Sequence, residues 1–116
     1  MPIKKVILAG GGTGGHIYPA LAIASEIKRL YSDVKIVFVG TEMGLEKTLI
    51  PKAGYPLRII RVKGFRRKLS LDTLSSIKQM ILGGIDSLTI LKREKPDLVI
   101  GTGGYVSGPI IFFASL

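Results

Sequence analysis

The sequence predicts an α/β protein with a parallel sheet that is covered by helices on both faces. Short runs rich in β-branched residues alternate with longer segments of mixed composition, which is typical of βαβ units. Short apolar runs of this kind are expected of strands that are buried on both faces. Two of the runs lead directly into glycine clusters, at points where parallel strands turn into helices. At 116 residues the chain has the size of one domain or of part of a larger one.

The first half of the chain is predicted to contain two strands, each followed by a helix. Residues 5–9 are a short apolar run that ends in glycine, and residues 34–39 form a second such run. Residues 18–31 repeat apolar side chains at helical spacing, with charged side chains on the other face. Residues 43–53 are expected to form a short helix, which Gly54 ends.

The second half repeats this order. Residues 57–62 alternate apolar and basic side chains as a third strand, and residues 97–100 form a fourth after a proline. Residues 70–94 are predicted to be a long helix. Residues 107–116 begin another helix, with Pro109 in its first turn. Because the apolar run continues to the last residue, we expect residues 1–116 to be a truncated domain.

The composition excludes several classes of protein. With no cysteine and one histidine, the chain has no disulfide, thiolate metal site or multi-histidine metal centre. It is 47% hydrophobic, which is too apolar for a disordered chain, but glycine, proline and charge interrupt it too often for a membrane span. The first residues fit no signal peptide, so a cytosolic protein is expected. No cofactor or metal is expected.

Positive charge is concentrated in one third of the chain. The formal net charge is +9, and residues 57–95 hold ten basic and three acidic residues. This asymmetry favours an anionic partner, although a solvated basic face would have the same composition. Nucleic acid is the less favoured partner because the chain has no tryptophan and no recognised reading module.

The first glycine cluster, residues 10–15, lies between a strand and a helix. Glycines let backbone N–H groups approach a ligand, and a helix N-terminus adds partial positive charge, so a diphosphate suits this position. The spacing also satisfies the dinucleotide fingerprint, with Glu42 as the ribose-binding acid. A nicotinamide- or flavin-binding domain is therefore an alternative. A turn that serves only close strand–helix packing is another.

His16 follows this cluster directly. Imidazole titrates near neutral pH, and a helix N-terminus favours its neutral form, so His16 is a candidate general base or hydrogen-bond donor to a phosphate. A second cluster, residues 101–109, follows the fourth predicted strand in the same way, with Ser107 as a helix cap. The two clusters together could hold a diphosphate, or each could be an ordinary turn.

The segment after Gly64 combines cations with apolar side chains, which suits an anionic membrane surface. The alternative is that the apolar side chains of its helix simply face the core. A basic module that binds lipid without catalysis is a further reading. The candidate membrane contacts are Phe65, Arg66, Arg67, Lys68, Leu74, Ile77, Lys78 and Ile81.

Two segments together resemble the MurG family of bacterial glycosyltransferases. They are AGGGTGGHIYPA at residues 9–20 and GTGGYVSGP at residues 101–109. The FVGT run at residues 38–41, Glu46 and the PKAG turn at residues 51–54 are also similar to that family, so the resemblance covers essentially the whole chain.

This resemblance implies the N-terminal, acceptor-side half of a GT-B fold with a Rossmann-like sheet. It implies transfer of N-acetylglucosamine (GlcNAc) from UDP-GlcNAc to the C4 hydroxyl of the N-acetylmuramic acid (MurNAc) unit of lipid I, with inversion and no obligatory metal. The place implied is the cytoplasmic face of the plasma membrane, with the nucleotide-sugar domain absent from this chain. His16 would act at the transfer centre, as a catalytic base or as a polar contact. The implied substrate contacts are Thr13, Gly14, Gly15, Gly103, Gly104, Tyr105 and Ser107.

Overall fold

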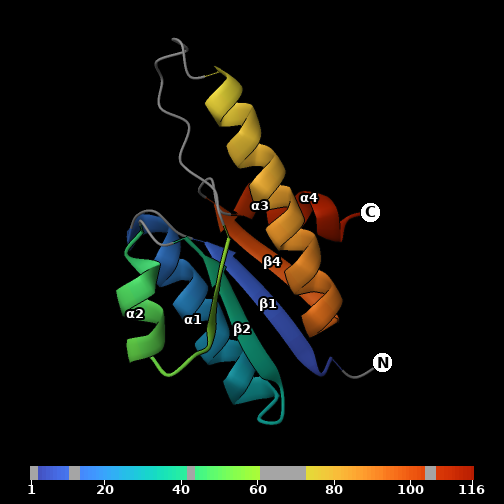
Figure 1. Cartoon of the computed structure of the whole chain (residues 1–116). Coiled ribbons are helices and arrows are strands. Elements are labelled where there is room, and N and C mark those ends of the chain that lie inside the picture. The colour runs from blue at the N-terminus through green and yellow to red at the C-terminus, as the bar shows by residue number, and fades with distance from the viewer. Residues whose placement is uncertain (1–2, 11–13, 42–43, 61–72, 104–106) are drawn as a thin grey trace.

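The computed structural model describes residues 3–10, 14–41, 44–60, 73–103 and 107–116. Within these ranges strands and helices alternate along the chain (Figure 1). The elements are β1 (Lys5–Gly10), α1 (Gly14–Leu30), β2 (Lys35–Gly40), α2 (Glu46–Lys52), β3 (Leu57–Ile59), α3 (Thr73–Glu94), β4 (Leu98–Gly103) and α4 (Ser107–Ala114).

The described strands form a parallel sheet in the order β3-β2-β1-β4. In β1, one of the two inner strands, Val6 pairs with Ile36 of β2 on one side and with Leu98 of β4 on the other. The register between β1 and β4 shifts once, because Ala9 pairs with Gly101 whereas Gly10 pairs with Gly103. Thr102 is therefore an extra residue in β4, as in a β-bulge. The predicted class, a parallel sheet with helices on both faces, is confirmed.

Alternate residues of the strands belong to two different cores. Val6, Leu8 and Phe38 pack with Ala20 of α1 and Ile50 of α2 on one face of the sheet. This alternation follows from the two-residue period of a strand, which sends successive side chains to opposite faces.

On the other face, Ile7 and Val37 pack with Ile90 of α3 and Ile110 of α4. Figure 1 shows the resulting three layers, with α1 and α2 on one side of the sheet and α3 and α4 on the other. Helix α4 also lies close against α3, since a Cβ atom on Gly84 would be 2.8 Å from Phe113 Cε2.

Two predicted boundaries near the glycine clusters are wrong. Helix α1 begins at Gly14 rather than residue 18, so the end of the first cluster and His16 form its first turn. Strand β4 extends to Gly103 rather than residue 100, so part of the second cluster is strand. At the end of β4, pairing with β1 outweighs the low strand propensity of glycine.

Two carboxylates form ion pairs and hydrogen bonds near the amino ends of β1 and β4. Glu94, at the end of α3, pairs with Lys5 of β1 and with Arg58 of β3, whose Nε lies 3.0 Å from Glu94 Oε1. The hydrogen bond from Lys5 is the main cause that lowers the pKa of Glu94. Asp97 accepts hydrogen bonds from the backbone N–H groups of Lys4 and Lys5 at 2.8 and 3.0 Å, and these bonds lower its pKa.

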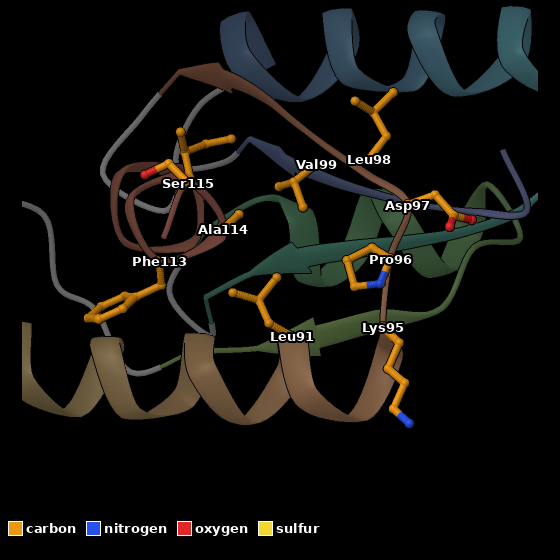
Figure 2. A pocket seen from close by; sticks show the side chains of 10 residues that line it. Leu91, Lys95, Pro96, Asp97, Leu98, Val99, Phe113, Ala114 and Ser115 are labelled. Carbon is orange, nitrogen blue, oxygen red and sulfur yellow. The ribbon is translucent and has the colours of Figure 1, made fainter. Parts of the chain in front are cut away.

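An open groove of about 500 Å³ lies between the ends of α3 and α4 and the start of β4. Figure 2 shows Leu91 of α3, Val99 of β4 and Phe113 of α4 around it. Its other lining residues are Lys95, Pro96, Asp97, Leu98, Ile111, Ala114 and Ser115. The groove is lined from the amino end of β4 and contains none of the predicted site residues.

Candidate functional site at the carboxyl edge of the sheet

The two glycine clusters meet at the carboxyl edge of the sheet. Strands β1 and β4 are neighbours, and Gly10 at the end of β1 pairs with Gly103 at the end of β4. Helices α1 and α4 begin close to these strand ends, at Gly14 and Ser107. Ligands of open parallel sheets bind at this edge, so the topology brings the two predicted anion cradles together.

A hydrogen bond joins the two clusters. The hydroxyl of Thr102 donates to the backbone oxygen of His16 over 2.7 Å. Gly10 lies directly beneath this bond, because a Cβ atom there would be 1.9 Å from Thr102 Oγ1 and 2.9 Å from the His16 oxygen. The first turn of α1 is thus attached to the end of β4, and only glycine fits between them.

The imidazole of His16 lies against Gly103. A Cβ atom on Gly103 would be 2.8 Å from His16 Cδ2 and 3.1 Å from Nε2, and Gly103 has a φ of +112°. Both the left-handed backbone and the close ring favour glycine at this position. His16 as a whole is half-buried.

Helices α1 and α4 begin four residues after the ends of β1 and β4. Helix α1 has 17 residues and α4 has eight, and each carries about half a positive charge at the end near the strands. Unpaired backbone N–H groups at such ends bind phosphates and carboxylates. The arrangement can therefore hold an anionic group beside the His16 imidazole.

The turn after β2 is fixed by a buried carboxylate at the same edge. Glu46 accepts hydrogen bonds from Thr41, from the backbone N–H at 2.8 Å and from the hydroxyl at 3.0 Å. Gly40 and Gly44 leave room for it, since Cβ atoms there would be 2.3 Å from Glu46 Cγ and 2.0 Å from its Oε2. Glu42, the acid required by the dinucleotide alternative, lies outside the described residues.

The described part of the chain contains several of the predicted site residues. Gly14, Gly15 and His16 form the first turn of α1, Gly103 ends β4, and Ser107 is the first residue of α4. Thr13, Gly104 and Tyr105 lie outside the described residues, as do the loop positions Phe65, Arg66, Arg67 and Lys68. The sequence reasoning did not select Thr102 or Gly10 as separate site residues. The signal for Thr102 was a hydroxyl side chain within a run of glycines.

The predicted membrane contacts that are described lie on α3. Leu74 and Ile77 are in its first turns, and Lys78 and Ile81 are exposed. Ile85 and Leu88 continue the exposed apolar stripe, and Lys92 follows them at the same helical spacing. Ile81, one of the predicted membrane contacts, is therefore part of an exposed apolar stripe that includes two further side chains.

Among the described residues, no group of three or more histidine, cysteine, aspartate or glutamate side chains could hold a metal ion. None of the helices described is long and apolar enough to cross a membrane.

A parallel sheet with two glycine clusters at its carboxyl edge is shared with a known family of glycosyltransferases. The profile of the glycosyltransferase family 28 N-terminal domain matches residues 6–116, and the chain belongs to this family.

Particular members of the family are close in sequence. The chain is 58% identical over 111 residues to the UDP-N-acetylglucosamine--N-acetylmuramyl-(pentapeptide) pyrophosphoryl-undecaprenol N-acetylglucosamine transferase of Ruminiclostridium cellulolyticum. That match covers 96% of this chain and 30% of the relative. The transferase of the same name from Clostridioides difficile is 51% identical over 114 residues, which are 98% of this chain and 28% of that protein.

A solved structure gives the same result. The crystal structure of Acinetobacter baumannii MurG superimposes with a TM-score of 0.80 at 29% identity. The match covers 97% of this chain and 32% of that structure. The chain thus spans about 30% of the length of the curated relatives that it matches.

Proposed function

We propose that this chain is the acceptor-side domain of an inverting glycosyltransferase that makes lipid II from lipid I and UDP-GlcNAc. The observation that carries the proposal is the contact between His16 and Gly103, at the edge of the sheet after which α1 and α4 begin, in a family 28 domain. The relatives from R. cellulolyticum and C. difficile are named as transferases of GlcNAc to this kind of acceptor. The greater part of the donor site belongs to a second domain of the complete enzyme.

The residues of the junction have different roles in this reaction. Thr13, Gly14 and Gly15, with Gly103, Gly104, Tyr105 and Ser107, bind the substrates and hold a diphosphate. The imidazole of His16 accepts the proton of the MurNAc C4 hydroxyl while that oxygen attacks the anomeric carbon of GlcNAc. The bond between this carbon and the diphosphate breaks, and UDP leaves with the electron pair. The positive helix ends offset the charge of the phosphates without a metal.

The exposed residues of α3 support the proposal that this domain contacts the membrane surface. Lipid I is a membrane lipid, so its transferase must work at the bilayer surface. The stripe of Ile81, Ile85 and Leu88 has Lys78 at one end and Lys92 at the other. Apolar side chains between cations suit insertion beside anionic headgroups, each cation contributing about 1 kcal/mol. With the loop residues Phe65–Lys68, this face would lie on the cytoplasmic side of the plasma membrane as a peripheral contact.

A binding experiment tests the acceptor site in this chain. Amide resonances are followed by NMR while a soluble lipid I analogue is added, and NADH is added in a parallel titration. We expect shifts for Gly10, Gly14–His16 and Gly101–Ser107 with the analogue alone. Equal or larger shifts with NADH would instead support the dinucleotide alternative and contradict the acceptor site.

A turnover experiment tests the role of His16. This chain replaces the 111 aligned residues of the R. cellulolyticum relative, and GlcNAc transfer to the lipid I analogue is measured. We expect product from the chimera and none from this chain alone. In the chimera, His16→Ala should lower kcat by about 10²-fold or more with little change in KM, as for loss of a general base. An unchanged kcat would exclude that role, and a raised KM alone would make His16 a binding residue.

A further inference from the structure

We propose that Thr102 is a positioning residue, whose hydroxyl holds the first turn of α1 against β4 so that the His16 imidazole lies over Gly103. The consequence for catalysis rests on the proposed function of His16. The positioning itself rests only on contacts in the described structure.

The bulge between β1 and β4 places the hydroxyl. Ala9 pairs with Gly101 and Gly10 with Gly103, which leaves Thr102 outside the regular pairing. A bulge redirects a side chain and ends regular pairing, and bulges are common beside active sites. Here the side chain of Thr102 reaches the backbone oxygen of His16, 86 positions away in the sequence.

Gly10 is required for the same bond. A side chain at this position would occupy the space of Thr102 Oγ1, to which a Cβ atom would approach within 1.9 Å. It would also come within 2.9 Å of the His16 oxygen, which is backbone and has little freedom to move. Gly10, Thr102 and His16 therefore form one packed unit.

This unit determines where the imidazole lies. Gly103 follows Thr102 directly, and its α-carbon faces His16 Cδ2. When the hydroxyl attaches the backbone of His16 to β4, the ring is held over this α-carbon. Without the hydrogen bond, the first turn of α1 loses one contact that holds it to β4, and we expect the position of the ring to shift. A fixed general base is worth more than a mobile one because the transferred proton must lie within hydrogen-bond reach.

NMR of the single histidine tests the proposal in this chain without any ligand. His16 gives one set of imidazole signals because the sequence contains no other histidine. In the unchanged chain we expect a nuclear Overhauser contact between His16 Hδ2 and the Gly103 α-hydrogen that points at the ring. Absence of this contact would overturn the proposal.

Two substitutions at Thr102 separate the hydroxyl from the methyl group. Thr102→Val keeps the shape and removes the donor, and we expect loss of the Overhauser contact and a shift of the imidazole signals. Thr102→Ser keeps the donor and should restore both. If Thr102→Val leaves the signals unchanged, or if Thr102→Ser behaves like Thr102→Val in a folded protein, the hydroxyl does not position the ring.

A matched control and a second variant complete the experiment. Thr89→Val also removes a threonine hydroxyl that donates to a backbone oxygen, that of Ile85 at 2.9 Å on α3, and should leave the His16 signals unchanged. If Thr102→Val does not fold, Gly10→Ala decides. It should produce the loss expected for Thr102→Val, and unchanged His16 signals would overturn the proposal. A failed lipid I titration beside an intact Thr102 effect would contradict only the proposed function.

Discussion

At the scale of single residues, the glycines matter because they have no side chain, which leaves space for neighbouring polar groups. Gly10 leaves room for a hydrogen bond, Gly103 for an imidazole, and Gly40 and Gly44 for the carboxylate of Glu46. Each of these four glycines packs closely against a polar group of another residue. The glycine clusters are therefore packing sites for specific polar groups as well as possible anion cradles.

The position of the His16 ring gives a prediction with a matched control. Gly103→Ala places a methyl group 2.8 Å from His16 Cδ2 at a φ of +112°. Gly54→Ala introduces alanine at a φ of +92° with no atom within 4 Å. Each should lose about 1–2 kcal/mol of unfolding free energy, because both positions are left-handed.

Only the first of these variants should move the ring. The end of the histidine side chain is able to swing away from the new methyl group, so we expect the imidazole NMR signals to change in Gly103→Ala and not in Gly54→Ala. Urea unfolding measures the stability of each variant. Identical His16 signals in the two variants would contradict the contact between the ring and Gly103.

At the scale of elements, α3 has two faces with different environments. Ile90 and Leu91 pack against the sheet, whereas Ile81, Ile85 and Leu88 remain exposed. The first face is the one that attaches the helix to the sheet. The second leaves apolar side chains on the surface, which the core does not explain.

The exposed stripe predicts a membrane effect without a stability effect. Ile81 is 58% exposed on α3, and Leu30 is 57% exposed on α1. Ile81→Ser should weaken binding to vesicles that contain anionic lipid, whereas Leu30→Ser should not. Neither should change the unfolding free energy by more than about 0.5 kcal/mol, as is usual for surface positions. Sedimentation with vesicles at low salt measures the binding, and equal binding of the two variants would contradict a membrane role for this stripe.

At the scale of the whole molecule, Glu94 connects elements that are far apart in the sequence. Its carboxylate, with 11% of the side chain exposed, binds Lys5 of the first strand and Arg58 of the third. It lies at the amino ends of the strands, away from the carboxyl edge that holds His16. The ion pairs of Glu94 thus join α3 to the sheet near the amino ends of the strands, whereas the candidate site lies at their carboxyl ends.

This connection predicts how stability depends on pH. The pKa of Glu94 is lower in the folded protein, mainly because of the hydrogen bond from Lys5, so the unfolded chain binds more protons in this range. The contribution of Glu94 is complete above the ordinary glutamate pKa of about 4.3 and is lost as the pH falls through the lower folded value.

Glu94→Gln tests this dependence. The variant should be less stable than the unchanged chain at pH 7, and the difference should shrink toward pH 3. Urea unfolding at several pH values measures it. Some loss in acid should remain in the variant, because the pKa of Asp97 is also lowered and its contribution has the same sign. A difference that stays constant with pH would show that the charge of Glu94 does not contribute.

Local patterns along the chain are enough to predict the class of fold and the order of its elements. Periodicity and glycine breaks located each strand and helix, and Gly54 was correctly predicted to end α2. These features depend on neighbours within a few residues, so a local pattern is sufficient to predict them. The two glycine clusters were also predicted to lie at one edge, because parallel strands place their carboxyl ends together.

The tertiary structure alone decided how the clusters touch. The shift of register after Ala9, the bond from Thr102 to His16 and the ring over Gly103 all depend on pairing between β1 and β4, which are separated by most of the chain. The same pairing extends β4 to Gly103. Local propensity contains no information on such contacts, because their free energy comes from packing between segments that are remote in sequence.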